Sequence, residues 1–277
     1  MAKPKIVPLE WSRPSDIIAL FVLTGILAEE EPQSLLLVGQ PSVGKSALLR
    51  RFSNVKWLAP VFDMTMSAMY DVVFPSMRDS KQTHLVMTEF HKMYDRQKAT
   101  AENAINTLSS AMSGDLGKSF VGPNKWTGFE DFRIGVLGAM TTANYGRWAS
   151  KMKDSGLLSR FSVYTIRMSV EMLQEQRRAA LWQDGYMLGP YDFRKIDITD
   201  TDKREVGMSA LMMRAAHDVA ETVPAGAITA RSSQMVRALM KASALLRGSR
   251  HVEQKDVETV RAIIFTLYDL GEAHGKR

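Results

Sequence analysis

The segment from Gly39 to Ser46 combines the residue types that bind phosphate groups. It reads Gly39-Gln40-Pro41-Ser42-Val43-Gly44-Lys45-Ser46 and fits the pattern GxxxxGK[ST] at every fixed position. In this pattern the glycines let backbone N–H groups turn toward a phosphate chain, the lysine reaches the β- and γ-phosphates, and the hydroxyl binds Mg²⁺. The segment, with Ala47 directly after it, therefore predicts a site for a nucleoside triphosphate.

The residues on either side predict the elements that this pattern requires. Leu35 to Val38 is an apolar run of the kind found in buried strands, and residues 47–52 can continue as a helix whose N-terminus faces the phosphates. A glycine-rich turn without function is the alternative. Few chance matches lie between a buried strand and a helix, so we favour the phosphate site.

A carboxylate ends a second apolar run, residues 83–90. Hydrolysis needs an acid near Mg²⁺ and the attacking water, at the end of a neighbouring strand, and Glu89 is the acid in this run. Many such enzymes carry Asp-Glu at this point, but here Thr88 precedes Glu89.

Two arrangements are open for this pair. In one, Thr88 replaces the metal-side acid and Glu89 activates the water. In the other, Glu89 is the metal-side acid and the base lies elsewhere. We favour a composite in which Glu89 serves the metal or the water and Thr88 adds a hydroxyl. Slow or absent turnover and a merely structural salt bridge are the alternatives.

Further polar groups adjoin two other predicted strands. Thr142 and Asn144, with Thr141 close behind, follow the run 133–140 and would hydrogen-bond the γ-phosphate or position the water, unless they only terminate the strand. Arg160 precedes the alternating run 161–166, where it would enter the nucleotide site of a neighbouring subunit and stabilise the developing charge.

Taken in order, these segments resemble the boxes of the AAA+ ATPases (ATPases associated with diverse cellular activities). GQPSVGKS resembles Walker A, LVMTEF Walker B, AMTTAN sensor 1 and GLLSRF the arginine-finger box, over about Ile17 to the C-terminus. The resemblance implies ATP and Mg²⁺ as cofactors, with metal contacts from Ser46 and Glu89. It implies catalytic roles for Lys45, Glu89, Thr142, Asn144 and Arg160. It also implies a sensor 2 arginine, Arg231 or Arg237, which couples a helical lid to the nucleotide state.

The resemblance extends into the C-terminal part of the chain. Residues 242–248 and 251–257 look like the lid end of minichromosome-maintenance helicases, Holliday-junction branch-migration motors and MoxR-type ATPases. We therefore expect an α/β fold with a P-loop parallel sheet flanked by helices, followed by a small all-helical lid domain. The expected division is an N-terminal arm at 1–15, a nucleotide-binding domain at 16–168 and the lid at 169–277.

The elements that would build this fold follow from apolar periodicity and turn residues. We expect helices over 17–28, with Ser15 or Asp16 as the cap, and over 67–77, 99–112, 170–182, 202–219, 232–247 and 254–273. Besides the strand before Gly39, we expect strands over 61–64, 83–90, 133–140 and 161–166, and a hairpin or flexible loop over 114–128.

Composition bounds the class of protein. The chain has 277 residues, a net charge of +6 and no cysteine, so disulfides and thiolate metal sites are excluded. The longest apolar segment, 17–28, is interrupted by Thr24 and Gly25 and is too short for a membrane span. Residues 1–5 are not followed by the apolar core of a secretory signal, and cysteine is absent, so we expect a cytoplasmic protein. The basic balance favours an acidic partner, with nucleic acid first, although a solvated basic surface explains it equally well.

We therefore expect a homo-oligomer, a ring or filament, that binds Mg-ATP between subunits and acts on DNA as a replication or recombination motor, helicase or loader, such as a phage or mobile element would encode. Lys118, Lys125 and Trp126 would contact the DNA strand, unless Trp126 and Phe129 are only hydrophobic anchors. A MoxR-like or unfoldase-like ATPase that remodels proteins is one alternative. An ATP-dependent assembly scaffold with weak hydrolysis is the other.

Overall fold

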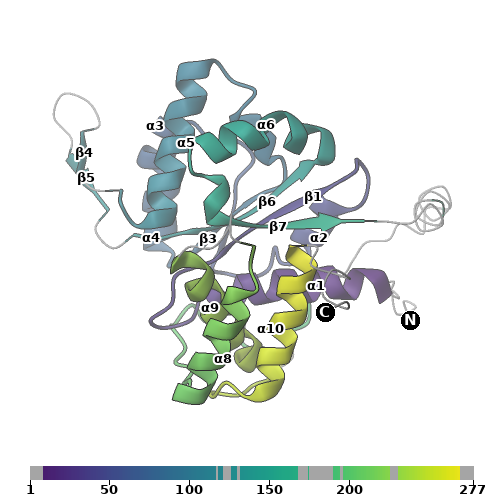
Figure 1. Ribbon diagram of the computed structural model, residues 1–277. Helices are drawn as coiled ribbons and strands as arrows, with labels where there is room; N and C mark the ends of the chain where they lie inside the picture. The colour runs from purple at the N-terminus through teal and green to yellow at the C-terminus, as the bar shows by residue number, and fades with distance from the viewer. Residues whose placement is uncertain are drawn as a thin grey trace, which may run out of the picture.

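The chain folds around a parallel sheet. The computed structural model describes residues 9–116, 118–120, 126–129, 132–167, 174, 190–193, 196–224 and 230–268. The five-stranded sheet has the order β2-β3-β6-β1-β7. Its strands are β1 (Ser34–Gly39), β2 (Leu58–Pro60), β3 (His84–Met87), β6 (Gly135–Thr141) and β7 (Phe161–Ile166). Helices cover both faces (Figure 1), so the expected α/β class is confirmed.

Strand β1 is the most enclosed strand of the sheet. All six of its residues are buried, and it pairs in parallel with β6 on one side and β7 on the other. A parallel strand covered on both faces is apolar without alternation, which explains the leucine run that begins at Leu35. Gly39 lies opposite Thr141 and Ile166, so three strands end together. We call this side of the sheet its carboxyl edge, and the opposite side its amino edge.

The first face of the sheet is covered by helices from both ends of the chain. These are α1 (Leu9–Thr24), α2 (Lys45–Arg50), α8 (Ala210–Glu221), α9 (Ala230–Leu246) and α10 (Gln254–Leu267). Phe21 of α1, Leu37 of β1 and Val236 of α9 belong to one hydrophobic cluster. The C-terminal helices therefore share a core with the sheet, below it in Figure 1.

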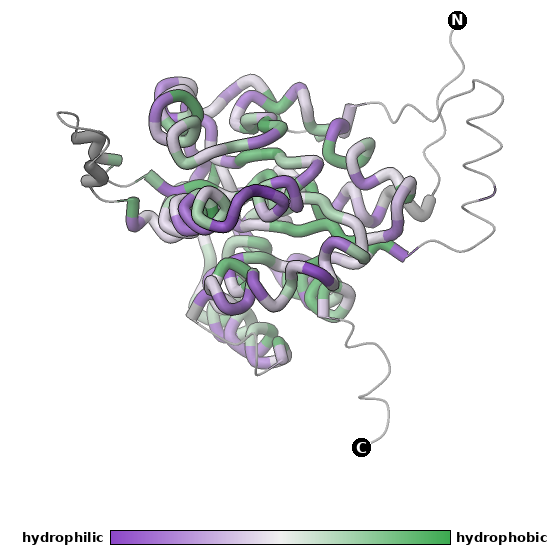
Figure 2. Tube along the Cα trace, turned by 90° about the horizontal axis from the view of Figure 1, so that it is seen from above, coloured by the Kyte–Doolittle hydropathy of each residue, from purple (hydrophilic) through white to green (hydrophobic). Residues whose placement is uncertain are grey.

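The second face carries the helices from the middle of the chain. They are α3 (Met66–Ala68), the π-helix η1 (Met69–Val73), α4 (Phe74–Asp79), the 3₁₀ turns η2 (Phe90–Met93) and η3 (Leu158–Arg160), α5 (Lys98–Ser113) and α6 (Thr142–Asp154). Leu36 of β1, Phe74 and Leu108 lie in the cluster on this side. Figure 2, seen from above, shows hydrophobic strands at the centre of the molecule.

A two-stranded hairpin stands away from the sheet. Its strands, β4 (Lys118–Phe120) and β5 (Trp126–Gly128), pair antiparallel with Phe120 opposite Trp126. The sequence predicted a hairpin or loop here, and Figure 1 shows the hairpin projecting from the body of the protein. Phe129, next along the chain, is buried against Phe74 and Phe132, which confirms it as a hydrophobic anchor.

Several predicted bounds were wrong. Helix α1 already begins at Leu9, so Ser15 and Asp16 lie inside it and do not cap it; the Ser15 hydroxyl instead accepts a hydrogen bond from Arg51. The second strand is β2 (Leu58–Pro60) rather than 61–64, because the chain leaves the sheet at Phe62, whose side chain is 72% exposed. Both differences arise from tertiary packing, which overrides local pattern.

The C-terminal bounds differ as well. Helix α8 begins at Ala210 rather than 202, with Ser209 as its cap, because the preceding residues pair with the turn after α1 through Arg204 and Ile26. The predicted helix over 170–182 lies almost wholly outside the described residues. Within the part of the chain that the structure describes, no helix is long and apolar enough to cross a bilayer.

A buried histidine lies under the turn that joins α1 to β1. His84 Nε2 donates to the carbonyl oxygen of Gln33 at 3.1 Å, and its Nδ1 lies 3.2 Å from the Thr83 hydroxyl. Gly25 and Gly135 flank the ring: a Cβ on Gly135 would lie 2.4 Å from His84 Cδ2. Burial, assisted by the charge of Lys203, lowers the pKa of His84 to about 4. The imidazole is therefore neutral at physiological pH.

We predict that His84 makes the fold sensitive to acid. The histidine pKa is about 6.5 in the unfolded chain, so the unfolded state binds the proton more readily as pH falls. We expect the free energy of unfolding to drop by about 2 kcal/mol between pH 7.5 and pH 5 from this residue alone. His84→Gln should be less stable at pH 7.5 but should lose less on acidification, as measured by urea denaturation.

His217→Gln is the matched control, because His217 is an exposed side chain of α8 that pairs with Glu221. It should retain the pH dependence of the original protein. An unchanged pH dependence in His84→Gln would show that the buried imidazole does not control acid stability.

Candidate functional site

The loop between β1 and α2 has the backbone conformation that its glycines permit. Gly44 caps α2 with φ of 80°, and Ser42 also has a positive φ, 66°, which is uncommon for a residue with a Cβ. A Cβ on Gly39 would lie 3.0 Å from the Ile166 carbonyl oxygen, a tight contact that glycine avoids where β7 lies beside the start of the loop. The predicted order of strand, loop and helix is present.

Lys45 lies folded inside this loop. Its Nζ donates to the carbonyl oxygens of Gly39 at 2.9 Å and Gln40 at 2.7 Å, and the residue is only 8% exposed. Burial lowers the pKa of Lys45, and the negative charge of Glu89 opposes that shift. A buried ammonium held by two carbonyl oxygens is well placed for stronger anionic acceptors.

Glu89 lies at the same edge of the sheet as Lys45. It follows β3 after Thr88 and precedes the turn η2, with its side chain 41% exposed. The negative charge of Glu89, after β3, raises the pKa of Lys45, in the loop after β1. The structure therefore brings together a cation and a carboxylate that the sequence separates.

A histidine next to Glu89 was missed in the sequence. His91 Nδ1 lies 3.6 Å from Glu89 Oε2, and Nε2 lies 3.8 Å from Asp95. The spacing between Glu89 and His91 was visible in the sequence, but only the turn η2 brings the ring back toward the carboxylate. At 3.6 Å the ring is a close neighbour of the Glu89 carboxylate but not a hydrogen-bond partner.

The polar residues after β6 lie beside the loop. Thr141 caps α6, since its hydroxyl accepts a hydrogen bond from the Asn144 backbone N–H at 3.2 Å. Thr142 is the first residue of α6 and lines a cavity of about 250 Å³ beside the loop. The cavity is also lined by Gln40, Val43, Thr165, Ile166 and Arg167. Thr165 and Arg167 were missed, although both lie at the end of a correctly predicted strand.

Arg160 and Arg231 lie together at the amino edge. Both donate to Ser113 Oγ, Arg160 through Nε at 3.0 Å and Arg231 through Nη2 at 3.4 Å. Arg160 also donates to the Gly156 carbonyl oxygen at 2.6 Å. Burial and then the like charge of Arg231 lower the pKa of Arg160. Two guanidinium groups this close create a strongly positive region.

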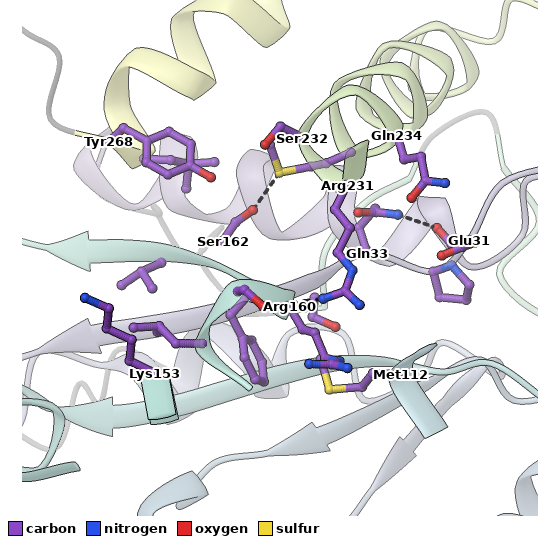
Figure 3. Close-up of a pocket in the computed structure, with 18 of the residues that line it drawn as sticks. Glu31, Gln33, Met112, Lys153, Arg160, Ser162, Arg231, Ser232, Gln234 and Tyr268 are labelled. Atoms are coloured by element: carbon purple, nitrogen blue, oxygen red, sulfur yellow. Dashed lines mark hydrogen bonds between the residues drawn. The ribbon is translucent and has the colours of Figure 1, made fainter. Parts of the chain in front are cut away.

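These arginines open on a large cavity at that edge. It has a volume of about 370 Å³ and is also lined by Glu31, Gln33, Lys153 and Tyr268 (Figure 3). Phe161, the residue after Arg160, pairs with Ser34 at the start of β1. The length of β1, about 17 Å at 3.3 Å per residue, therefore separates these arginines from the loop 39–46 of their own chain.

Arg237 is part of a buried ionic cluster. Its Nε donates to Glu30 Oε1 at 2.8 Å and Oε2 at 3.1 Å, while Lys241 Nζ lies 2.8 Å from the same carboxylate. The Glu30 side chain is 2% exposed. The cluster joins α9 to the segment before β1, so the structure places both candidate sensor 2 arginines away from the loop 39–46 of their own chain.

The described residues contain no group of three or more His, Cys, Asp or Glu side chains that could hold a metal ion by themselves. A Mg²⁺ ion at the loop would thus depend on Ser46, Glu89 and the phosphates of a bound nucleotide, which is how Mg²⁺ is commonly held. Of the candidate DNA contacts, Lys118 is in β4 and Trp126 in β5, while Lys125 lies outside the described residues.

Comparison with known proteins does not add to this geometry. No protein-family model and no curated protein matches the chain. The assignment of the site therefore rests on its residues and their arrangement.

We predict that Glu30 is essential for stability. Glu30→Ala would leave Arg237 and Lys241 adjacent without their carboxylate, and breaking a buried ion pair costs about 3–5 kcal/mol. Urea denaturation should show a loss of this size. Glu29→Ala is the control, because the Glu29 side chain is 85% exposed and lies 3.9 Å from Lys241; it should cost less than about 0.5 kcal/mol. Equal losses of unfolding free energy in Glu30→Ala and Glu29→Ala would contradict the assignment of Glu30 as the buried carboxylate that stabilises the cluster.

Proposed function

We propose that this protein is an ATPase of the AAA+ type that binds Mg-ATP on the loop 39–46. The observation that carries the proposal is the complete GxxxxGK[ST] segment on a strand, loop and helix, with Lys45 electrostatically linked to Glu89 across the carboxyl edge. A cation inside the loop and an acid at the same edge of the sheet are what phosphoryl transfer requires.

Each residue at the carboxyl edge has a defined role in this proposal. Lys45 would exchange its carbonyl partners for the β- and γ-phosphate oxygens. Ser46 and Glu89 would hold Mg²⁺, which neutralises phosphate charge when bound, and Glu89 would also orient the attacking water with the Thr88 hydroxyl nearby. Thr142 or Asn144 would hydrogen-bond the γ-phosphate.

The arginines at the amino edge favour action between subunits. Arg160 and Arg231 cannot span the length of β1 to reach their own loop, but they can face the carboxyl edge of a second copy. We therefore assign both to the site of a neighbouring subunit in a ring or filament, where they would stabilise the transferring phosphate. Arg237, held by Glu30, would keep a structural role.

DNA is the partner that we propose for the assembly. The support is the net charge of +6 and the projecting hairpin that begins at Lys118. If the substrate is instead a protein, as for a MoxR-like or unfoldase-like ATPase, the same nucleotide site would drive the remodelling and another surface would contact the substrate. Weak hydrolysis, which Thr88 in place of an acid favours, would make the protein an ATP-dependent scaffold.

We predict distinct effects at three residues in assays of ATP binding and phosphate release. Lys45→Ala should lose both binding and turnover, because the loop cation is removed. Glu89→Gln should bind ATP but lose at least about 100-fold in turnover, because the carboxylate serves the metal or the water. Arg160→Ala should bind ATP yet turn it over poorly, and mixing it with Lys45→Ala should restore part of the activity, since some interfaces then hold an intact loop and an intact arginine.

Glu102→Gln on the exposed surface of α5 is the control for Glu89→Gln and should behave as the original protein. ATP binding by Lys45→Ala at unchanged affinity would overturn the proposal. Unchanged turnover in Glu89→Gln would remove its assigned role, and ATP-dependent oligomers without phosphate release would favour the scaffold.

We also predict salt-dependent DNA binding through the hairpin. The double variant Lys118→Ala/Lys125→Ala should bind single- or double-stranded DNA more weakly, and the dependence of log K on log salt should fall by about 1–2 units, because fewer counterions are released. Lys98→Ala/Lys255→Ala removes the same charge from exposed sites elsewhere and is the matched control. Turnover stimulated by unfolded protein but by neither form of DNA would favour the remodelling ATPase.

A further inference from the structure

The end of β7 supplies a second cation at the carboxyl edge. We propose that Arg167, assisted by Thr165, binds the terminal phosphate of a nucleotide held on the loop of the same chain; this inference rests on the proposed function. In the register of β1 and β7, Val38 lies opposite Thr165 and Gly39 opposite Ile166. Arg167 is the next residue, so it comes level with Gln40 at the start of the loop.

The two residues face the same side of the sheet. Tyr164 and Ile166 are buried in the cluster with α1 and the C-terminal helices, and side chains alternate along a strand. Thr165 and Arg167 therefore point to the opposite side, where α6 begins. The cavity of about 250 Å³ is lined by Arg167, Thr165 and Thr142 together with Gln40 of the loop.

The loop residue beside Arg167 indicates which phosphate Arg167 would bind. The residues at the helix end of the loop, from Lys45 onward, hold the inner phosphates, with the lysine reaching toward the terminal one. Gln40 lies at the strand end, where the terminal phosphate is expected. Arg167 lines the same cavity as Gln40 and follows β7, on one side of β1 in the sheet. Glu89 follows β3, on the other side of β1.

The proposed contact compensates for the placement of the other arginines. Arg231 shares Ser113 with Arg160, and Arg237 is bound to Glu30, so neither lies at the loop of its own chain. A guanidinium group bonded to a phosphate oxygen forms a charge-assisted hydrogen bond, which is stronger than a neutral one. ADP lacks the terminal phosphate, so this bond would favour ATP.

The test compares MgATP and MgADP binding by isothermal titration calorimetry. Arg167→Ala should weaken MgATP binding about tenfold or more and change MgADP binding less than twofold, as expected for one charge-assisted bond. Arg167→Lys should recover part of the ATP affinity, because the charge is retained. Arg261→Ala, which removes an exposed arginine of α10, is the control and should change neither affinity.

Arg167 is exposed, and the thermal midpoint of each variant is measured first, so that a loss of nucleotide affinity is separated from a loss of folding. Equal loss of MgATP and MgADP affinity, or no loss of either, overturns the inference. Lys45→Ala distinguishes failure of this inference from failure of the proposed function. If Lys45→Ala abolishes MgATP binding while Arg167→Ala leaves the ratio of MgATP to MgADP affinity unchanged, only the role of Arg167 fails. If Lys45→Ala binds MgATP normally, the proposed function fails.

Discussion

The burial of β1 on both faces is the constraint on which the other features depend. A strand of leucine and valine without polar alternation must be covered from both sides, and here helices from the two ends of the chain cover one side and helices from its middle cover the other. The same burial fixes β6 and β7 as neighbours in register. The loop after Gly39, the residues after Thr141 and those after Ile166 consequently share one edge.

Much of this edge could be predicted from the sequence because parallel strands end on the same side. Apolar runs identified β1, β3, β6 and β7 but misplaced β2, and the bounds of β7 were predicted correctly from its alternating residues. The loop, Glu89 and Thr142 then follow as neighbours without any knowledge of the helices. Arg167 was missed for a simple reason: it is one residue past a strand, and only the register with β1 shows that it lies level with the loop.

The partners of the C-terminal arginines could not be predicted in this way. Periodicity places Arg231 and Arg237 on a helix but does not determine which part of the sheet that helix contacts. The acidic run Glu29-Glu30-Glu31 gives no sign of which carboxylate is buried, yet Glu30 alone binds both Arg237 and Lys241 closely. A second buried acid, Asp256, accepts hydrogen bonds from Ser243 and Arg247 and so joins α9 to α10. These paired charges hold α9 against the segment before β1 and against α10.

Arg160 and Arg231 lie at the amino edge of the sheet, and Lys45 lies at the carboxyl edge. This separation along β1 has a consequence for symmetry. If the amino edge of one copy meets the carboxyl edge of the next, the two contact surfaces are different, and no two-fold axis relates the copies. Such a heterologous contact leaves one surface of each kind unused in any pair, so assembly continues until a rotation closes it into a ring or it grows as a helical filament. The direction of β1 would then give the whole assembly a polarity, with every subunit pointing the same way around or along it.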